Sequence, residues 1–110
     1  MSQAKSHFFI CSICSQIRDK ESATEYVHQP ENNTSFPEAV GKLKIARDID
    51  TNFELRQCPE CKTYYLYRSI YEFLVGFGGS YDEYILWRIT DEMGKDYVEG
   101  RLSEPPAGMI

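Results

Sequence analysis

The sequence predicts a small α+β domain in which a β-hairpin and two or three short helices surround two paired-cysteine turns. The first observation is size, because 110 residues with a hydrophobic share of 42% suit one globular domain. The second is that the cysteines form two Cys-x-x-Cys pairs, Cys11 with Cys14 and Cys58 with Cys61. The third is that strand-like segments alternate with segments that have helical spacing and capping residues.

The first half of the chain predicts one cysteine turn, a loop and a helix. The apolar run at 7–10 predicts a short strand that enters the turn at Cys11. Residues 28–35 are dense in turn formers and have no apolar period, which predicts a loop. A capping-box spacing of Ser35 and Glu38, followed by apolar residues at helical intervals, predicts a helix over 36–46.

The middle of the chain predicts a β-hairpin around the second cysteine pair. Residues 48–52 resemble a turn, and 53–57 alternate between apolar and polar residues on the way to Cys58. Residues 63–71 are rich in tyrosine and predict a strand that pairs with 53–57. A helix over 63–71 is an alternative to the strand, because the tyrosines are also spaced three and four residues apart.

The last third predicts two further helices. The glycine-rich segment 76–79 breaks any regular element, and Ser80 with Glu83 repeats the capping-box spacing, which predicts a helix over 81–88. Thr90 predicts the cap of another helix that runs to about Val98 and stops near Gly100. One domain is therefore expected over 1–102, followed by a flexible tail over 103–110.

The cysteine spacing predicts one structural zinc ion. Two residues between cysteines allow a tight turn to direct both thiolates at one point, and two such turns supply a tetrahedral set of four ligands. No export signal and no apolar run long enough to span a membrane are visible, so we expect a cytoplasmic protein whose thiols stay reduced. Such turns are typical of zinc ribbons and treble clefs, and the expected ligands are Cys11, Cys14, Cys58 and Cys61.

Other chemistry for the cysteines stays open. A different thiolate-bound metal or cluster fits the same ligands, and Cys58 with Cys61 has the spacing of a redox dithiol. His7 and His28 are further candidate ligands, although four thiolates already complete a zinc shell. A complete shell leaves no position for water, so we expect no catalysis at the metal.

The net charge of −5 favours a protein partner over nucleic acid, because phosphate binding needs clustered Lys and Arg. Most of the aromatic residues fall between 64 and 87, where they are core residues or part of a recognition surface. Two acidic pairs, at 82–83 and 91–92, are expected at helix starts. The candidate partner-binding residues are Asp82, Glu83, Tyr84 and Trp87.

A resemblance to known proteins begins at the second cysteine pair. It rests on Cys58-Pro-Glu-Cys-Lys-Thr-Tyr-Tyr-Leu-Tyr-Arg-Ser-Ile-Tyr-Glu-Phe-Leu-Val, followed by Gly79-Ser80, Asp82-Glu83 and Arg88-Ile-Thr90. This stretch resembles small, uncharacterised bacterial zinc-binding proteins with a CPxC turn and a tyrosine-rich segment of YEY or YEF type. The resemblance covers about a third of the chain and implies two zinc ligands and a helix cap at Ser80, with no catalytic residue. The chain departs from the pattern at Lys62, where a glycine is usual, and at 77–78.

These observations predict a non-enzymatic, zinc-stabilised module that binds another protein, with no membrane association. One version is an immunity or antitoxin-like inhibitor of a basic bacterial protein, because opposite charge speeds association. The alternative is a nucleic-acid-binding or transcription-regulatory zinc ribbon, and an enzyme is the third possibility. The alternative needs a local basic face, for which the candidates are Lys42, Lys44, Arg47, Arg56, Lys62 and Arg68.

Overall fold

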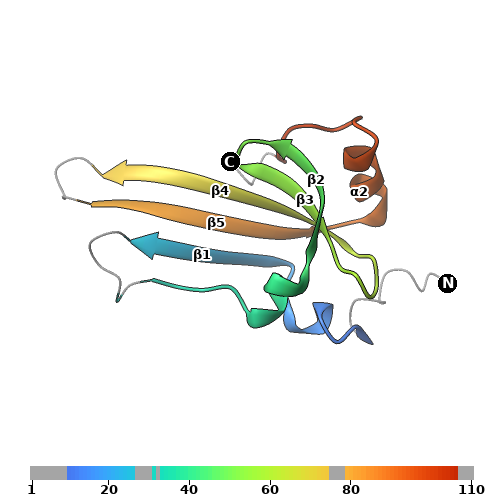
Figure 1. Cartoon of the computed structure of the whole chain (residues 1–110), viewed down its shortest axis with the longest axis horizontal. Helices are drawn as coiled ribbons and strands as arrows, with labels where there is room; N and C mark the ends of the chain where they lie inside the picture. The colour runs from blue at the N-terminus through green and yellow to red at the C-terminus, as the bar shows by residue number, and fades with distance from the viewer. Residues whose placement is uncertain (1–9, 27–30, 32, 75–78, 107–110) are drawn as a thin grey trace.

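The frame of the molecule is a five-stranded antiparallel sheet with the strand order β1-β5-β4-β3-β2 (Figure 1). A computed structural model describes residues 10–26, 31, 33–74 and 79–106. The helix α2 follows the last strand, and the 3-10 helices η2 and η4 precede β2. The elements are η2 (Cys14–Gln16), β1 (Lys20–Tyr26), η4 (Glu38–Lys42), β2 (Lys44–Asp50), β3 (Phe53–Gln57), β4 (Tyr64–Leu74), β5 (Gly79–Ile89) and α2 (Asp91–Val98).

The hairpin of β4 and β5 is the longest part of the sheet. Its register runs without a shift from Tyr64 opposite Ile89 to Leu74 opposite Gly79. Because β3 pairs with β4 only as far as Arg68, the ends of β4 and β5 project beyond β2 and β3 together with β1 (Figure 1). We call this projecting part, residues 23–26, 69–74 and 79–84, the arm.

Each face of the sheet buries its own core, because successive side chains of a strand point to opposite faces. On one face, Tyr65 and Leu86 pack with the four cysteines, η2 and η4. On the other face, Leu55 and Leu66 pack against Tyr97 of α2. We call these the cysteine face and the helix face. The 3-10 helices η2 and η4 accordingly lie on the opposite side of the sheet from α2 (Figure 1).

The predicted helix after Thr90 is confirmed as α2. The Thr90 side chain accepts a hydrogen bond from the backbone N–H of Met93, which caps the first turn, and Asp91 and Glu92 lie in that turn. The helix ends before Gly100, whose φ of 83° suits glycine better than other residues. The strand predicted over 63–71 and its pairing with 53–57 are also confirmed.

The helix predicted over 81–88 is wrong, because these residues belong to β5. Ser80 pairs with Phe73 in the ladder, so it is not a helix cap, and Asp82 and Glu83 do not lie at a helix start. Leu86 faces one core while Ile85 and Trp87 pack against the other. An apolar run with both faces buried has no simple alternation, so the capping-box spacing was the stronger local signal and it misled the prediction.

The helix predicted over 36–46 is reduced to the short 3-10 helix η4, and β2 begins at Lys44. Val40 and Leu43 are buried as the helical pattern required, but a single turn is enough to bury them. The turn predicted over 48–52 is confined to Thr51 and Asn52, because β2 extends to Asp50.

Three other expectations fall wholly or partly outside the described residues. For the strand predicted over 7–10, only Ile10 is described, and it has helical geometry. In the loop predicted over 28–35, Thr34 forms an isolated bridge with Thr24. Of the glycine-rich break predicted over 76–79, only Gly79 is described, and it begins β5. Within the predicted tail, the Glu104 carbonyl accepts a hydrogen bond of 2.7 Å from the Tyr97 hydroxyl.

Candidate metal centre

The second cysteine pair lies in the loop between β3 and β4. Cys58 directly follows β3, and its N–H donates to the Thr63 carbonyl over 2.9 Å. The Lys62 N–H donates back to the Cys58 carbonyl over 3.1 Å, which closes the turn around Cys61. Lys62 has a φ of 69°, the left-handed conformation that favours glycine. Lys62, which stands where a glycine is usual in the proteins that this chain resembles, therefore has a strained backbone.

The first cysteine pair lies where the N-terminal segment turns into η2. The Ser15 N–H donates to the Cys11 carbonyl over 3.0 Å, and the Ile17 N–H donates to the Cys14 carbonyl over 3.0 Å. Ile13 and Ile17 are both buried in the core of the cysteine face. These two apolar side chains fix the turn to the sheet, because burying each contributes about 1.5–3 kcal/mol.

The two turns bring all four thiols together. The sulfur atoms of Cys11, Cys14, Cys58 and Cys61 all lie within 4.8 Å of one another. The Sγ atoms of Cys11 and Cys58 are 3.6 Å apart, and those of Cys14 and Cys61 are 3.5 Å apart. A tetrahedral ion with bonds of about 2.3 Å requires sulfur separations of about 3.8 Å. The predicted ligands are therefore close enough to hold one metal ion.

The protonation of the thiols is set by burial and by neighbouring donors. Burial raises the pKa of Cys14 and of Cys58, because a thiolate is poorly solvated there. Burial acts the same way on Cys61, but hydrogen bonds from the Thr63 hydroxyl and N–H outweigh it and lower the Cys61 pKa. A divalent cation in the centre would stabilise all four thiolates and reverse the effect of burial.

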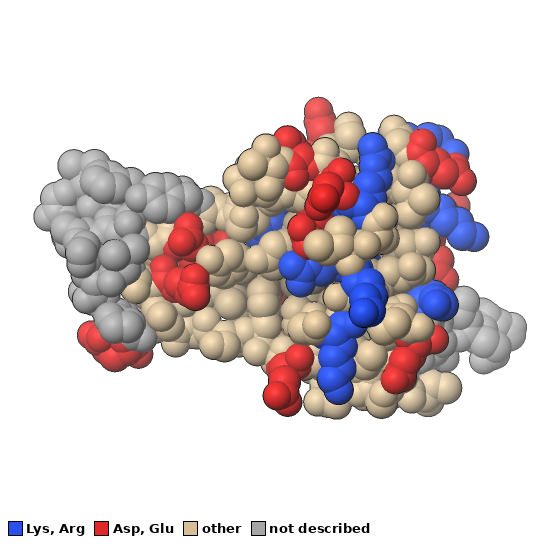
Figure 2. Space-filling model, in the orientation of Figure 1, with Lys and Arg blue, Asp and Glu red and all other residues tan. Residues whose placement is uncertain are grey.

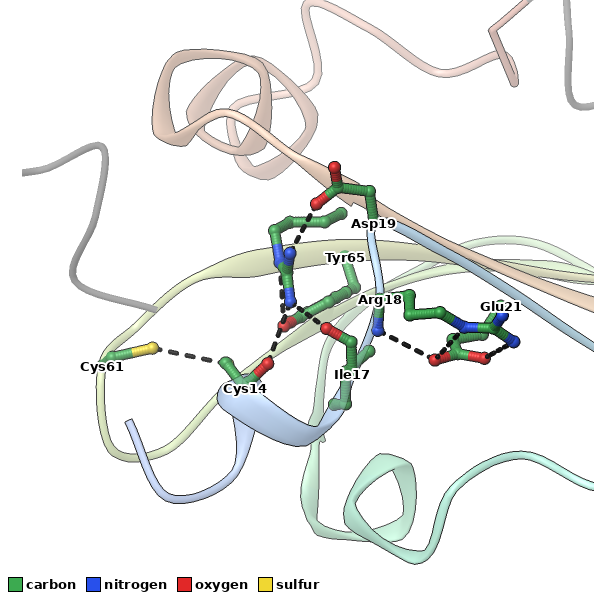
Figure 3. A network of polar contacts seen from close by, with 8 residues as sticks. Cys14, Ile17, Arg18, Asp19, Glu21, Cys61 and Tyr65 are labelled. Atoms are coloured by element: carbon green, nitrogen blue, oxygen red, sulfur yellow. Dashed lines mark hydrogen bonds and ion pairs between the residues drawn. The ribbon is translucent and has the colours of Figure 1, made fainter. Parts of the chain in front are cut away.

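A second layer of polar groups surrounds the thiols. The Thr63 hydroxyl lies 3.1 Å from the Cys61 sulfur, and the Tyr65 hydroxyl hydrogen-bonds to the Cys14 thiol, which lowers the Cys14 pKa. The Arg88 guanidinium donates to the Tyr65 hydroxyl over 3.3 Å and to the Cys14 carbonyl over 3.0 Å (Figure 3). Arg88 also pairs with Asp19 at 2.5 Å, so it ties β5 to the first cysteine turn.

A buried carboxylate follows this network along the chain. Glu21 is only 4% exposed and accepts hydrogen bonds from the Arg18 backbone N–H over 2.8 Å and from its guanidinium over 2.9 Å (Figure 3). Although burial raises the Glu21 pKa, the hydrogen bonds and charge of Arg18 outweigh it, and the pKa lies below its usual value. Glu21 therefore holds the entry of β1 in place as an ionised group.

The four candidate partner-binding residues do not share a surface. All four lie on β5, where successive side chains point to opposite faces of the sheet. Tyr84 stacks on Tyr67, a residue that packs against the core of the cysteine face. Trp87 packs against the core of the helix face, beneath Lys20. By strand alternation Asp82 lies on the face of Tyr84, and Glu83 lies on the face of Trp87.

Sequence reasoning missed Thr63, Tyr65 and Arg88 as neighbours of the cysteines. Thr63 and Tyr65 follow Cys61 by two and four residues, so strand alternation after the turn could have placed them near the metal. Arg88 had no such signal, because it reaches the site only through the pairing of β5 with β4, in which it lies opposite Tyr65.

A second feature lies away from the cysteines, at the turn between β2 and β3. It is a cavity of 490 Å³ lined by Asp50, Thr51, Asn52, Phe53, Arg68, Ser69, Ile70 and Pro105. The Nη1 atom of Arg68 is buried there without a hydrogen-bond partner.

None of the described helices is long and apolar enough to cross a membrane. Comparison of the chain with protein-family models, with curated proteins and with solved structures found no match.

Proposed function

We propose that this protein is a non-enzymatic module, stabilised by one structural zinc ion, that binds another protein. The observation that carries the proposal is the set of four thiols, three buried and one partly buried, that lie within 4.8 Å of one another. Four thiolates fill a tetrahedral shell and leave no position for a substrate or a water molecule. A site of this kind contributes folding energy rather than chemistry.

Zinc fits the donor set best. It takes four cysteine thiolates in tetrahedral geometry, and it needs no redox partner. Outer groups that orient the ligands are typical of zinc sites, and Thr63 and Tyr65 are in position to do so here. The two turns also join segments separated by 43 residues, so the metal closes a long loop.

The distribution of charge supports a protein partner. Residues 21–41 and 69–87 contain no Lys or Arg, and the sheet brings parts of both segments together in the arm. Figure 2 shows the Lys and Arg of this face gathered over the other half of the molecule, among further acidic side chains, while the charged side chains visible toward the arm are acidic. Clustered negative charge steers a basic partner and speeds association. An inhibitor of a basic protein, of immunity or antitoxin type, is the version that we favour.

The contacts of the candidate basic residues weaken the nucleic-acid alternative. Arg56 pairs with Glu54 at 2.7 Å on the cysteine face, and the Arg47 guanidinium donates to the Tyr97 carbonyl beside α2. Arg68 points its buried Nη1 atom into the protein. These arginines are used within the fold and are not arranged as one stripe for a phosphate backbone.

Two measurements test the proposal. Elemental analysis should give about one zinc per chain, and a strong chelator should unfold the protein cooperatively. A metal-free sample that keeps its full structure would refute the structural role of zinc.

The second measurement is purification of the zinc-loaded protein from its own host. A basic protein that stays bound to it, and is not retained by the Cys58→Ser variant, supports the proposed function. Polynucleotide that stays bound at high salt would favour the zinc-ribbon alternative instead.

A further inference from the structure

The cysteine face of the sheet already holds one arginine side chain between an aromatic ring and a carboxylate. The Arg56 guanidinium carbon lies 3.9 Å from the centre of the Tyr67 ring. The Arg56 Nε atom lies 2.7 Å from a Glu54 carboxylate oxygen. The ring face attracts the cation, and the carboxylate fixes its orientation.

Among the described residues, the neighbouring ring repeats this arrangement without a cation. Tyr84 stacks beside Tyr67, with ring centres 6.2 Å apart and planes inclined by 13°. Its hydroxyl donates to a Glu25 carboxylate oxygen over 2.8 Å. This bond, with burial and the charges of Glu25 and Asp82, raises the Tyr84 pKa to about 12, so the hydroxyl keeps its proton and remains the donor to Glu25.

The carboxylates beside Tyr84 are uncompensated. Glu25 and Asp82 lie directly opposite each other on β1 and β5, an arrangement in which like charges destabilise a sheet. Within the described part of the chain, neither residue takes part in an ion pair. The strands that carry them supply no Lys or Arg over residues 21–26 and 69–87. A cation from outside the chain would satisfy both groups.

We propose that Tyr84, Glu25 and Asp82 form a subsite on the arm that binds an arginine side chain of a basic protein partner. This rests on the proposed function and names the surface that carries it out. Arginine is the expected residue because its planar guanidinium stacks on the Tyr84 ring while its N–H groups bond to the carboxylates at the ring edge. Lysine has a compact ammonium group and cannot make both contacts as well.

The test uses the zinc-loaded full-length protein and two fluorescent peptides. The peptides are identical except that one carries four arginines and the other four lysines, so their charge is the same. Fluorescence anisotropy gives each Kd. We expect the arginine peptide to bind about fivefold more tightly, which corresponds to the upper range of an exposed cation–π contact. Equal binding of the two peptides would overturn the arginine subsite.

Two matched variants locate the subsite. Asp82→Asn and Glu83→Gln remove the same charge at adjacent positions on opposite faces of β5. We expect Asp82→Asn to raise the Kd of the arginine peptide about threefold to fivefold, and Glu83→Gln to change that Kd by less than about twofold. Equal effects of both variants would show attraction by net charge only and would refute the subsite.

The aromatic contribution is tested in the same way. Tyr84→Leu should remove the preference for arginine over lysine, whereas Tyr84→Phe should keep it, because phenylalanine retains the ring face. Circular dichroism and zinc content of each variant establish that it is folded. If Tyr84→Leu is not folded, the comparison of Asp82→Asn with Glu83→Gln decides the matter alone.

The outcome is separable from that of the proposed function. A basic partner that is retained from the host but binds Asp82→Asn and Tyr84→Leu as tightly as the unaltered protein would place its site elsewhere and refute this subsite alone. Absence of any zinc-dependent protein partner would refute the proposed function whatever the peptides do.

Discussion

Gly94 of α2 offers a direct test of how the helix packs on the sheet. A Cβ atom at this position would lie 2.1 Å from Cδ2 and 2.8 Å from Cβ of Tyr64. The ring can rotate, but the Tyr64 Cβ is fixed by the backbone of β4, so the helix itself must move away. Gly94→Ala therefore disturbs the contact between α2 and the core of the helix face.

The magnitude follows from two opposing effects. In an exposed helix, alanine is more stable than glycine by about 1 kcal/mol. Overpacking a buried contact costs about 1–3 kcal/mol. The cost should be near its upper end here, because two ring atoms of Tyr64 lie within 2.3 Å and the third clashing atom, its Cβ, is fixed in the strand. We expect Gly94→Ala to lower the free energy of unfolding by about 1–2 kcal/mol.

Urea unfolding of the zinc-loaded protein, followed by circular dichroism, measures the effect. Gly41→Ala is the matched control, because an added Cβ at Gly41 meets no atom within 4 Å. This control should leave stability unchanged or raise it by up to about 1 kcal/mol. If Gly94→Ala stabilised the protein as much as Gly41→Ala, the packing of α2 against Tyr64 would be refuted.

Three further predictions concern the cysteine side of the sheet. Lys62→Gly should raise the free energy of unfolding by about 0.5–1 kcal/mol in urea titrations. Glycine adopts the φ of 69° without strain, and this gain exceeds the cost of the larger conformational entropy of glycine in the unfolded chain. A loss of stability would contradict the left-handed turn. Tyr65→Phe should lower the affinity for zinc about 10–100-fold in chelator competition, because the Cys14 thiolate loses the hydrogen bond from the Tyr65 hydroxyl. An unchanged affinity would count against that role of Tyr65. Glu21 has a pKa below its unfolded value of about 4.3, so its contribution to stability is present above that pH and is lost as the pH falls through the folded pKa. Glu21→Gln should therefore reduce the fall in urea midpoint as the pH drops below about 4.3, and an unchanged pH profile there would refute ionic pairing with Arg18.

The metal centre could be predicted from the sequence because its information is local. Each Cys-x-x-Cys turn fixes two ligands by spacing alone, and two such turns leave one way to complete a tetrahedral shell. The helix after Thr90 was predictable for the same reason, because its cap, its acidic first turn and the glycine beyond its end all lie within 11 residues. The hairpin of β3 and β4 could be placed because the second cysteine turn joins two strand-like segments.

The nature of residues 81–88 was decided only by tertiary structure. The capping-box spacing of Ser80 and Glu83 is a weak preference, whereas pairing along all of β5 with both β1 and β4 satisfies its backbone groups on two sides. That pairing also determines which side chains share a face. It places Asp82 and Tyr84 on one face of the sheet and Glu83 and Trp87 on the other. It also brings Arg88 to Cys14 and Tyr84 to Tyr67, although these residues lie far apart along the chain.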